Sequence, residues 1–299
     1  MRPSLWGIAW QAIRPRTLTL SLSPVLLGTS LAWAQGSPHH WQAFLASLLA
    51  ACLIQMGTNL HNDAVDFEKG NDQPDRPGPL RVTAAGWVSG TTVKNSAIAC
   101  FAGAFALGMY LVQVGGWPIV GIGLAALWAG WSYSGGSRPI SYSPLGEVFV
   151  LAFFGFAAVL GAAWLQGSFP NAISGLAALI CGLPAAAVLL VNNTRDRDAD
   201  QRVGRRTLAV LLGQKGATQV YRGLMLTPYG LLILLAGQGF FATLLGLFAL
   251  PAAWHHSQQF RLALTPKELA PLLPATAKNG FLLSLLTSLG FLVSALISA

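Results

Sequence analysis

The sequence predicts an all-α, polytopic membrane protein with nine transmembrane helices around a central cavity. Of its 299 residues, 54% are hydrophobic and only 9% are charged, whereas soluble domains carry roughly 25% charged residues. The mean hydropathy is +0.56. The apolar residues also form runs long enough to cross a bilayer as helices, which takes about 20 residues each.

Nine apolar segments are candidates for these spans, and the eighth is the shortest. They are Thr17 to Gln35, Trp41 to Phe67, Thr92 to Gln113, Trp117 to Ser134, Gly146 to Gln166, Asn171 to Asp198, Gly216 to Gly237, Phe240 to His255 and Lys278 to Ser298. None is typical of a cleavable signal peptide, because Arg14 and Arg16 precede the first and many more spans follow it. We expect a single domain over residues 1–299.

Charged residues avoid every second connection between spans. The connections after the first, third, fifth and seventh spans contain no Lys, Arg, Asp or Glu. The charged residues therefore gather on the opposite face, in the amino terminus, the other loops and the adjoining parts of the spans. Because basic loops stay in the cytoplasm, we expect a cytoplasmic amino terminus and a functional site that faces the cytoplasm.

The second predicted span ends in a polar cluster within the stretch NLHNDAVDFEKGND. Asn59, Asn62, Asp63 and Asp66 are three or four residues apart, so they share one side of a helix. An unpaired carboxylate is costly to remove from water. The cluster therefore predicts a partner that is cationic or a strong hydrogen-bond donor.

The sixth predicted span ends in a similar cluster within VLLVNNTRDRDADQRVG. Its members are Asn192, Asp196 and Asp200 at a spacing of four, with Asn193 beside the first. Spans two and six run in the same direction, because an odd number of spans separates them. The two acidic ends are therefore expected to face each other across one cavity.

The two clusters also suggest an internal duplication. The Asn and the first Asp of the second cluster each follow their counterparts in the first by 133 residues. The chain thus looks like two diverged halves, roughly 1–145 and 146–299.

The loops that follow both clusters are basic. They contain Arg76 and Arg81 after the first cluster, and Arg202, Arg205, Arg206 and Lys215 after the second. Facing carboxylates repel unless cations lie between them, and Mg²⁺ binds one or two carboxylates together with phosphate oxygens. Arginine suits the outer phosphate oxygens. The sequence therefore predicts Mg²⁺ and a diphosphate here, with simple pairing of solvated helix ends with arginine, or lipid contact by the arginines, as the alternatives.

A third polar patch follows the fourth span. It contains Tyr133 and then Arg138, the one basic residue of its loop, which is a candidate for contact with the diphosphate. For Tyr133 the alternative is an ordinary place in the aromatic belt at the membrane surface.

Five stretches resemble the intramembrane aromatic prenyltransferases of the ubiquinone-biosynthesis superfamily, and most closely its naphthoate branch. They are WQAIRPRTL, NLHNDAVDFEKGNDQPDRPGPLR, YSGGSRPISYSPLGEVFVLAFFG, NNTRDRDADQRVGRRTLAVLLG and PLLPATAKNGFLLSLLTSLG. The resemblance implies a nine-helix bundle in the bacterial inner membrane, among lipid and without a nucleic-acid partner. It also implies Mg²⁺-dependent transfer of a polyprenyl group from its diphosphate to 1,4-dihydroxy-2-naphthoate, with loss of CO₂ and pyrophosphate, to give demethylmenaquinone.

The resemblance also implies roles for individual residues. It assigns the metal to Asn59, Asp63, Asp66, Asn192, Asp196 and Asp200. It assigns catalysis to the four aspartates with Tyr133 and Arg138, and binding of the diphosphate to Arg76, Arg81, Asn62 and Asn193. Many members have a further Asp where this chain has Gly70, and Asp72 is a candidate to replace it.

Other functions remain open from the sequence. The acceptor could be another aromatic compound, the prenyl length is not set, and a secondary transporter or a lipid scaffold could also carry intramembrane carboxylates. Transporter sites lie near the membrane midplane on broken helices, whereas these acids lie at helix ends beside basic loops. A scaffold leaves the repeated acidic cluster unexplained.

Overall fold

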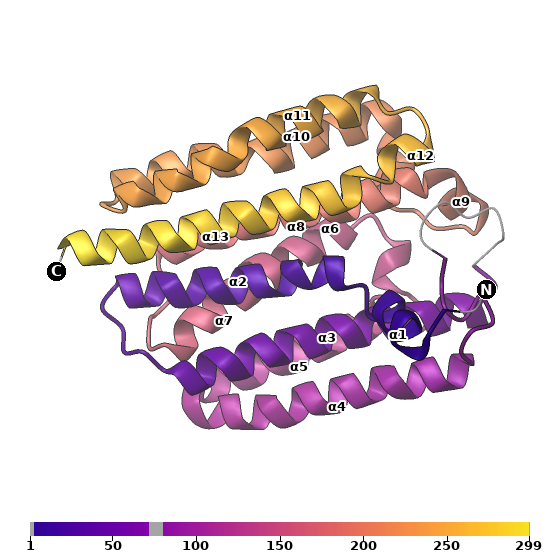
Figure 1. The fold of residues 1–299 in the computed structure, drawn as a ribbon, viewed down its shortest axis with the longest axis horizontal. Helices are drawn as coiled ribbons and strands as arrows, with labels where there is room; N and C mark the ends of the chain where they lie inside the picture. Colours follow the sequence, from indigo (N-terminus) through magenta and orange to yellow (C-terminus); the bar gives the residue numbers. More distant parts are fainter. Residues whose placement is uncertain (1–2, 72–79, 299) are drawn as a thin grey trace.

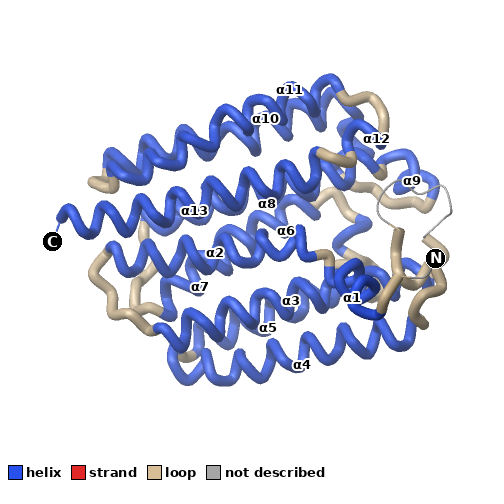
Figure 2. The backbone as a smooth tube through the Cα atoms, viewed as in Figure 1, coloured by secondary structure: helices blue, strands red, loops and turns tan. Residues whose placement is uncertain are grey.

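The protein is a bundle of helices that lie alongside one another (Figure 1). The structure is a computed structural model that describes residues 3–71 and 80–298. Within those ranges the chain forms helices, turns and loops, and no strand (Figure 2). The predicted all-α class is confirmed.

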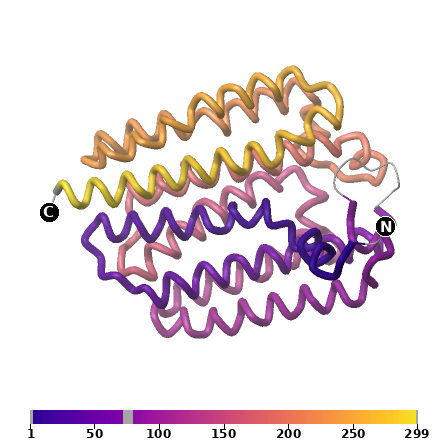
Figure 3. The backbone as a smooth tube through the Cα atoms, in the orientation of Figure 1, coloured from indigo at the N-terminus to yellow at the C-terminus, as the bar shows by residue number. Residues whose placement is uncertain are grey.

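The helices run back and forth along the bundle (Figure 3). In order they are α1 (Leu5–Ile13), α2 (Pro15–Ala34), α3 (Trp41–Glu68), α4 (Gly90–Gly115), α5 (Trp117–Ser132), the 3₁₀ turn η1 (Ile140–Tyr142), α6 (Gly146–Val150), the π-helical η2 (Leu151–Ala157), α7 (Ala158–Leu165), α8 (Ala172–Arg195), α9 (Arg197–Arg202), α10 (Leu208–Gly237), the 3₁₀ helix η3 (Phe241–Ala249), α11 (Leu250–Leu262), α12 (Pro266–Leu269) and α13 (Leu272–Ser298).

Seven of the described helical segments are long and apolar enough to cross a membrane, with α6, η2 and α7 counted as one segment and α12 with α13 as another. This makes the chain a multi-pass membrane protein. Each of the nine predicted spans coincides with helix, but α5 has only 16 residues. The predicted eighth span is a 3₁₀ helix followed by α11. The count of nine spans is therefore not confirmed, and the division into two halves stays a prediction.

Local sequence signals set the ends of several helices that line the cavity. Ser4 caps α1 by accepting the Gly7 N–H, and α1 ends at Arg14, which has a φ of 53°. Pro15 then begins α2, since proline suits the first position of a helix. Asn171 and Ser174 form a reciprocal cap at the start of α8.

The main apolar core lies among α2, α7, α8, α10, α11, η3 and α13. Two smaller clusters join α1, α3 and α4, and α3, α4, α5 and α7. Glycine allows the closest approach between α2 and α7, because a Cβ on Gly28 would collide with the carbonyl oxygen of Val159. The helices around the cavity thus pack directly against the main apolar core.

The ends of α3 and α8 lie at the same end of the bundle as α1, α9 and α12, on the right in Figure 1. The last turns of α13 lie at the opposite end (Figure 1). The predicted common direction of spans two and six is therefore confirmed, and their acidic ends share one end of the molecule.

Candidate active site

A cavity of about 1490 Å³ lies within the bundle. Its walls come from α2, α3, α4, α5, α6, η2, α7 and α8, together with the end of α1, η1, α9, the residues that follow α12 and the start of α13, whereas α10, η3 and α11 contribute no lining residue. The predicted central cavity is thus present, and α10, η3 and α11 pack outside the helices that line it.

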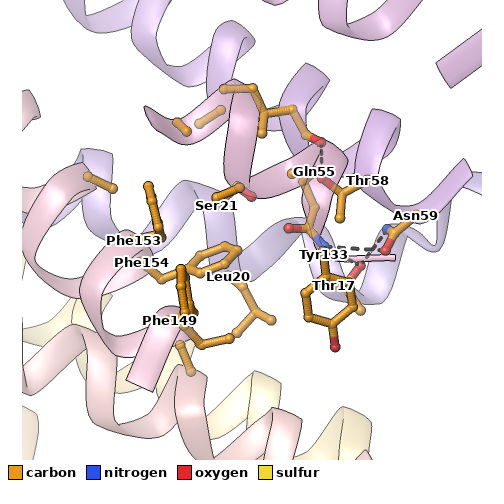
Figure 4. Close-up of a pocket in the computed structure, with 18 of the residues that line it drawn as sticks. Thr17, Leu20, Ser21, Gln55, Thr58, Asn59, Tyr133, Phe149, Phe153 and Phe154 are labelled. Atoms are coloured by element: carbon orange, nitrogen blue, oxygen red, sulfur yellow. Dashed lines mark hydrogen bonds between the residues drawn. The ribbon is translucent and has the colours of Figure 1, made fainter. Parts of the chain in front are cut away.

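The cavity has an apolar side and a polar side. Phe149, Phe153 and Phe154 gather on one side, while Asn59 and Tyr133 lie on the other (Figure 4). Mostly apolar pockets with a few placed polar groups are typical of ligand sites. The shape suits a ligand with a long apolar tail and a polar head.

Asn59 ties the polar side of the cavity to the start of α2. Its Nδ2 donates hydrogen bonds to the Ile13 carbonyl oxygen and to Thr17 Oγ1, both at 3.0 Å (Figure 4). One turn later, Asn62 also lines the cavity. Its Oδ1 is buried without a hydrogen-bond partner among the described residues, so this oxygen can still accept a bond from a ligand or bind a cation.

Asp63 faces the loop that follows α3. Its two carboxylate oxygens accept hydrogen bonds from the backbone N–H groups of Val82 and Thr83 and from the Thr83 hydroxyl. The side chain is buried and does not line the large cavity. In this structure Asp63 therefore anchors a loop, and its role as a metal ligand stays a prediction.

Asp66 is paired with two arginines and an asparagine. Arg81 Nη2 lies 2.7 Å from its Oδ2, and Arg205 Nη2 lies 2.5 Å from its Oδ1. Asn71 Nδ2 donates to the same Oδ1 at 3.0 Å. Arg81 also donates to the Asn62 carbonyl oxygen at 2.8 Å, so this arginine binds the end of α3 at two points.

The second acidic end lies where α8 breaks into α9, at Asp196. Arg195 binds the Asp196 carboxylate through two nitrogens, Nε at 2.7 Å and Nη2 at 2.9 Å. The same Nη2 donates to Asn192 Oδ1 at 2.9 Å. One turn on, Asp200 Oδ1 lies 3.3 Å from Arg205 Nη1. All of these side chains line the large cavity.

The two acidic ends meet, as the sequence predicts. Asp66, Asp196, Asp200 and Arg205 wall a small pocket beside the large cavity, and Arg205 binds both Asp66 and Asp200. Burial lowers the pKa of the Arg205 guanidinium, but the two carboxylates outweigh it and raise the pKa above its usual value. The group is therefore a permanent cation. The acids pair with arginine, as the simpler alternative expects, but they are buried and so are not solvated helix ends.

The remaining predicted residues divide into three groups. Tyr133 lines the cavity, as does Asn193, whose Nδ2 donates to Glu147 Oε1 at 2.9 Å. Arg138 is exposed and lines neither cavity, so the structure does not bring it to the other residues. Arg76 and Asp72 lie outside the described residues.

The structure adds residues that the sequence did not assign to the site. Arg195 pairs with Asp196, and Arg205, named from the sequence only as one of the basic loop residues, pairs with Asp200. Glu147 is buried beside Asn193. Arg14 and Arg16 line the cavity from the start of α2. The signal for the last two is their position immediately before the first span, which membrane orientation also explains.

The donor atoms at this end fit Mg²⁺. Within residues 3–71 and 80–298, no three His, Cys, Asp or Glu side chains converge into a ready-made cage. Mg²⁺ does not need one, since it binds through one or two carboxylates plus phosphate oxygens and water. Asp66, Asp196 and Asp200 supply carboxylates around one small pocket, with the Asn192 amide oxygen beside them.

The fold and the site together define an intramembrane protein for amphiphilic ligands, with acids and arginines where a charged head group would lie. Comparison with known proteins narrows the class: the chain belongs to the UbiA prenyltransferase family, whose model matches residues 21–296.

Named relatives and solved structures agree with this family. The chain is 36% identical to a 1,4-dihydroxy-2-naphthoate octaprenyltransferase of Escherichia coli (strain K12), over 96% of each chain. It is 32% identical to a protein of the same name from Haemophilus influenzae, over 95% of each chain. A UbiA homolog from Archaeoglobus fulgidus bound to DMAPP and Mg²⁺ has the same fold, with a TM-score of 0.64, 16% identity, and coverage of 94% of this chain and 99% of that one.

Proposed function

We propose that this protein transfers a polyprenyl group from a polyprenyl diphosphate to 1,4-dihydroxy-2-naphthoate, with Mg²⁺ as the cofactor. The observation that carries the proposal is the meeting of two acidic helix ends beside a large, mainly apolar cavity. The names of the relatives support the acceptor, and the ligands of the archaeal homolog support the diphosphate and the metal. We place the protein in the bacterial inner membrane with this end toward the cytoplasm, on the distribution of basic residues.

Different residues along the cavity have different roles. Asp66, Asp196, Asp200 and Asn192 hold Mg²⁺, which when bound offsets the charge that develops on the departing diphosphate. Arg81 and Arg205 line the cavity beside these acids, and we assign them to the outer phosphate oxygens, for which guanidinium is suited. Phe149, Phe153 and Phe154 line the side that receives the isoprenoid and exclude water from the allylic cation.

The bond changes balance without an external acid, base or oxidant. The allylic C–O bond breaks, and its electron pair leaves with pyrophosphate. The ring carbon that carries the carboxylate then bonds to the allylic carbon. Loss of CO₂ returns the electron pair of the broken C–C bond to the ring, which gives the prenylated naphthoquinol.

The proposal is tested with purified protein in detergent. The protein receives Mg²⁺, 1,4-dihydroxy-2-naphthoate and, one at a time, prenyl diphosphates of increasing length, and released pyrophosphate and product mass are measured. We expect Mg²⁺-dependent release of one pyrophosphate per prenylated product. No release from the wild-type protein with any donor would refute the function.

A matched pair of variants tests the site separately. Asp196→Asn removes a buried carboxylate, and we expect turnover to fall about 10²- to 10³-fold, as is typical for loss of an electrostatic stabiliser. Asp198→Asn makes the same chemical change two residues away, where the side chain is 82% exposed, and should keep wild-type turnover. Near-full turnover by Asp196→Asn would contradict the assignment of Asp196.

A further inference from the structure

Arg205 occupies an unusual position between the two acidic ends. Its Nη2 lies 2.5 Å from Asp66 Oδ1, and its Nη1 lies 3.3 Å from Asp200 Oδ1. The two carboxylates belong to helices far apart in the sequence, and the arginine side chain is only 14% exposed. One guanidinium therefore joins α3 to α9 in the place where a bridging metal ion is expected.

The surroundings of Arg205 favour its positive charge but leave one of its hydrogen-bond donors without a described partner. Its Cζ lies 4.8 Å from the centre of the Tyr142 ring, which favours a cation. Its Nε, however, is buried without a hydrogen-bond partner among the described residues. A buried donor without a partner is unfavourable. The position therefore favours a positive charge, but it is not specific for the hydrogen-bonding pattern of arginine.

We propose that Arg205 is an internal cation that substitutes for Mg²⁺ in the metal-free protein and is displaced when Mg²⁺ binds. The inference rests on the proposed function, because it places Mg²⁺ at Asp66 and Asp200. Arg81 offsets part of the charge of Asp66, but Arg205 contacts a carboxylate of each acidic end at once, so it holds the two ends together before substrate arrives.

The displacement couples the metal to the diphosphate. Mg²⁺ alone must compete with Arg205 for the carboxylates, which weakens its binding. A diphosphate that arrives with Mg²⁺ offers the released guanidinium a new anionic partner with matching geometry. Mg²⁺ and diphosphate therefore strengthen each other's binding, and this coupling is reciprocal.

Metal affinity measured without substrate tests the proposal. Mg²⁺ binding to the full-length protein is measured by calorimetry for the wild type, for Arg205→Gln and for Arg206→Gln. Arg206 is exposed and one residue away, so its variant loses the same charge without vacating the site. We expect Arg205→Gln to bind Mg²⁺ about tenfold more tightly, within the usual range of such couplings, and to lose most of the gain in Mg²⁺ affinity that inorganic pyrophosphate produces. Arg206→Gln should stay close to the wild type.

A second measurement needs no variant and so does not depend on how Arg205→Gln folds. Phenylglyoxal modifies accessible arginines, and mass spectrometry reports the rate at each site. We expect Mg²⁺ alone to speed modification of Arg205, added pyrophosphate to slow it again, and Arg206 to change little. Equal Mg²⁺ affinity in the two variants, or protection of Arg205 by Mg²⁺ alone, would overturn the proposal. Neither result depends on turnover, so prenyl transfer by the wild type would then still support the proposed function.

Discussion

Replacing Asp63 tests whether this residue anchors a loop or binds the metal. In Asp63→Ala, the buried N–H groups of Val82 and Thr83 lose their acceptor, and the Thr83 hydroxyl keeps only its longer bond, at 3.3 Å, to the backbone carbonyl oxygen of residue 63. A hydrogen bond to a charged group contributes about 1.5–3 kcal/mol. The N–H contacts are long, at 3.3 and 3.4 Å, so they add little. We expect a total loss of about 3 kcal/mol.

That loss is large enough to measure. At roughly 2 °C per kcal/mol for a chain of this size, the unfolding midpoint should fall by about 6 °C. The assay is tryptophan fluorescence during heating in detergent, for which the chain supplies 10 Trp residues. Thr83→Val removes the hydroxyl but keeps the carboxylate. It should cause a smaller fall, and the double variant should fall by less than the sum of the two.

The competing result is equally clear. If Asp63→Ala unfolds at the wild-type temperature but no longer binds Mg²⁺, Asp63 is a metal ligand and the reasoning from its hydrogen bonds is wrong. A lower midpoint with intact Mg²⁺ affinity would instead establish the loop anchor.

Two further predictions concern the packing behind the cavity. Gly28→Ala places a methyl group against the Val159 carbonyl oxygen and should destabilise the protein by about 1–3 kcal/mol; Gly175→Ala, which meets no atom within 4 Å, should not, and equal unfolding midpoints would contradict the packing argument. Asn279→Ala removes the Nδ2 that donates to the Ala249 carbonyl oxygen at 2.8 Å, where η3 passes into α11, and should cost roughly 2 kcal/mol. The fluorescence midpoint measures this too, and a value within error of wild type would show that the carbonyl finds another donor.

Helical spacing identified the site but not the direction of each side chain. Spacing placed the acids of each cluster near one another, and the common direction of spans two and six placed Asp66 at the same end of the bundle as Asp196 and Asp200. Asp63 belongs to the same pattern, yet it turns toward residues 82–83. Residues on the same side of a helix can face different neighbours. Whether a carboxylate lies against a cavity or against a loop depends on the path of that loop.

The sequence pattern also did not predict which charged side chains pair with one another. The basic loops predicted arginines near the acids, but not that Arg205 would bind Asp66, 139 residues away. Arg138 shows the opposite case. Its isolation in a polar loop indicated a site residue, whereas the structure leaves it exposed.

The sequence by itself determined the all-helical membrane class and the common end of the two acidic clusters, because hydropathy, helical period and span parity are local or additive properties of a chain. Only the tertiary structure decided which carboxylates line the cavity, which one anchors a loop, and which arginine lies between the two ends. Those outcomes depend on distances between segments far apart in sequence, and buried charges take whichever partner the packing brings within reach.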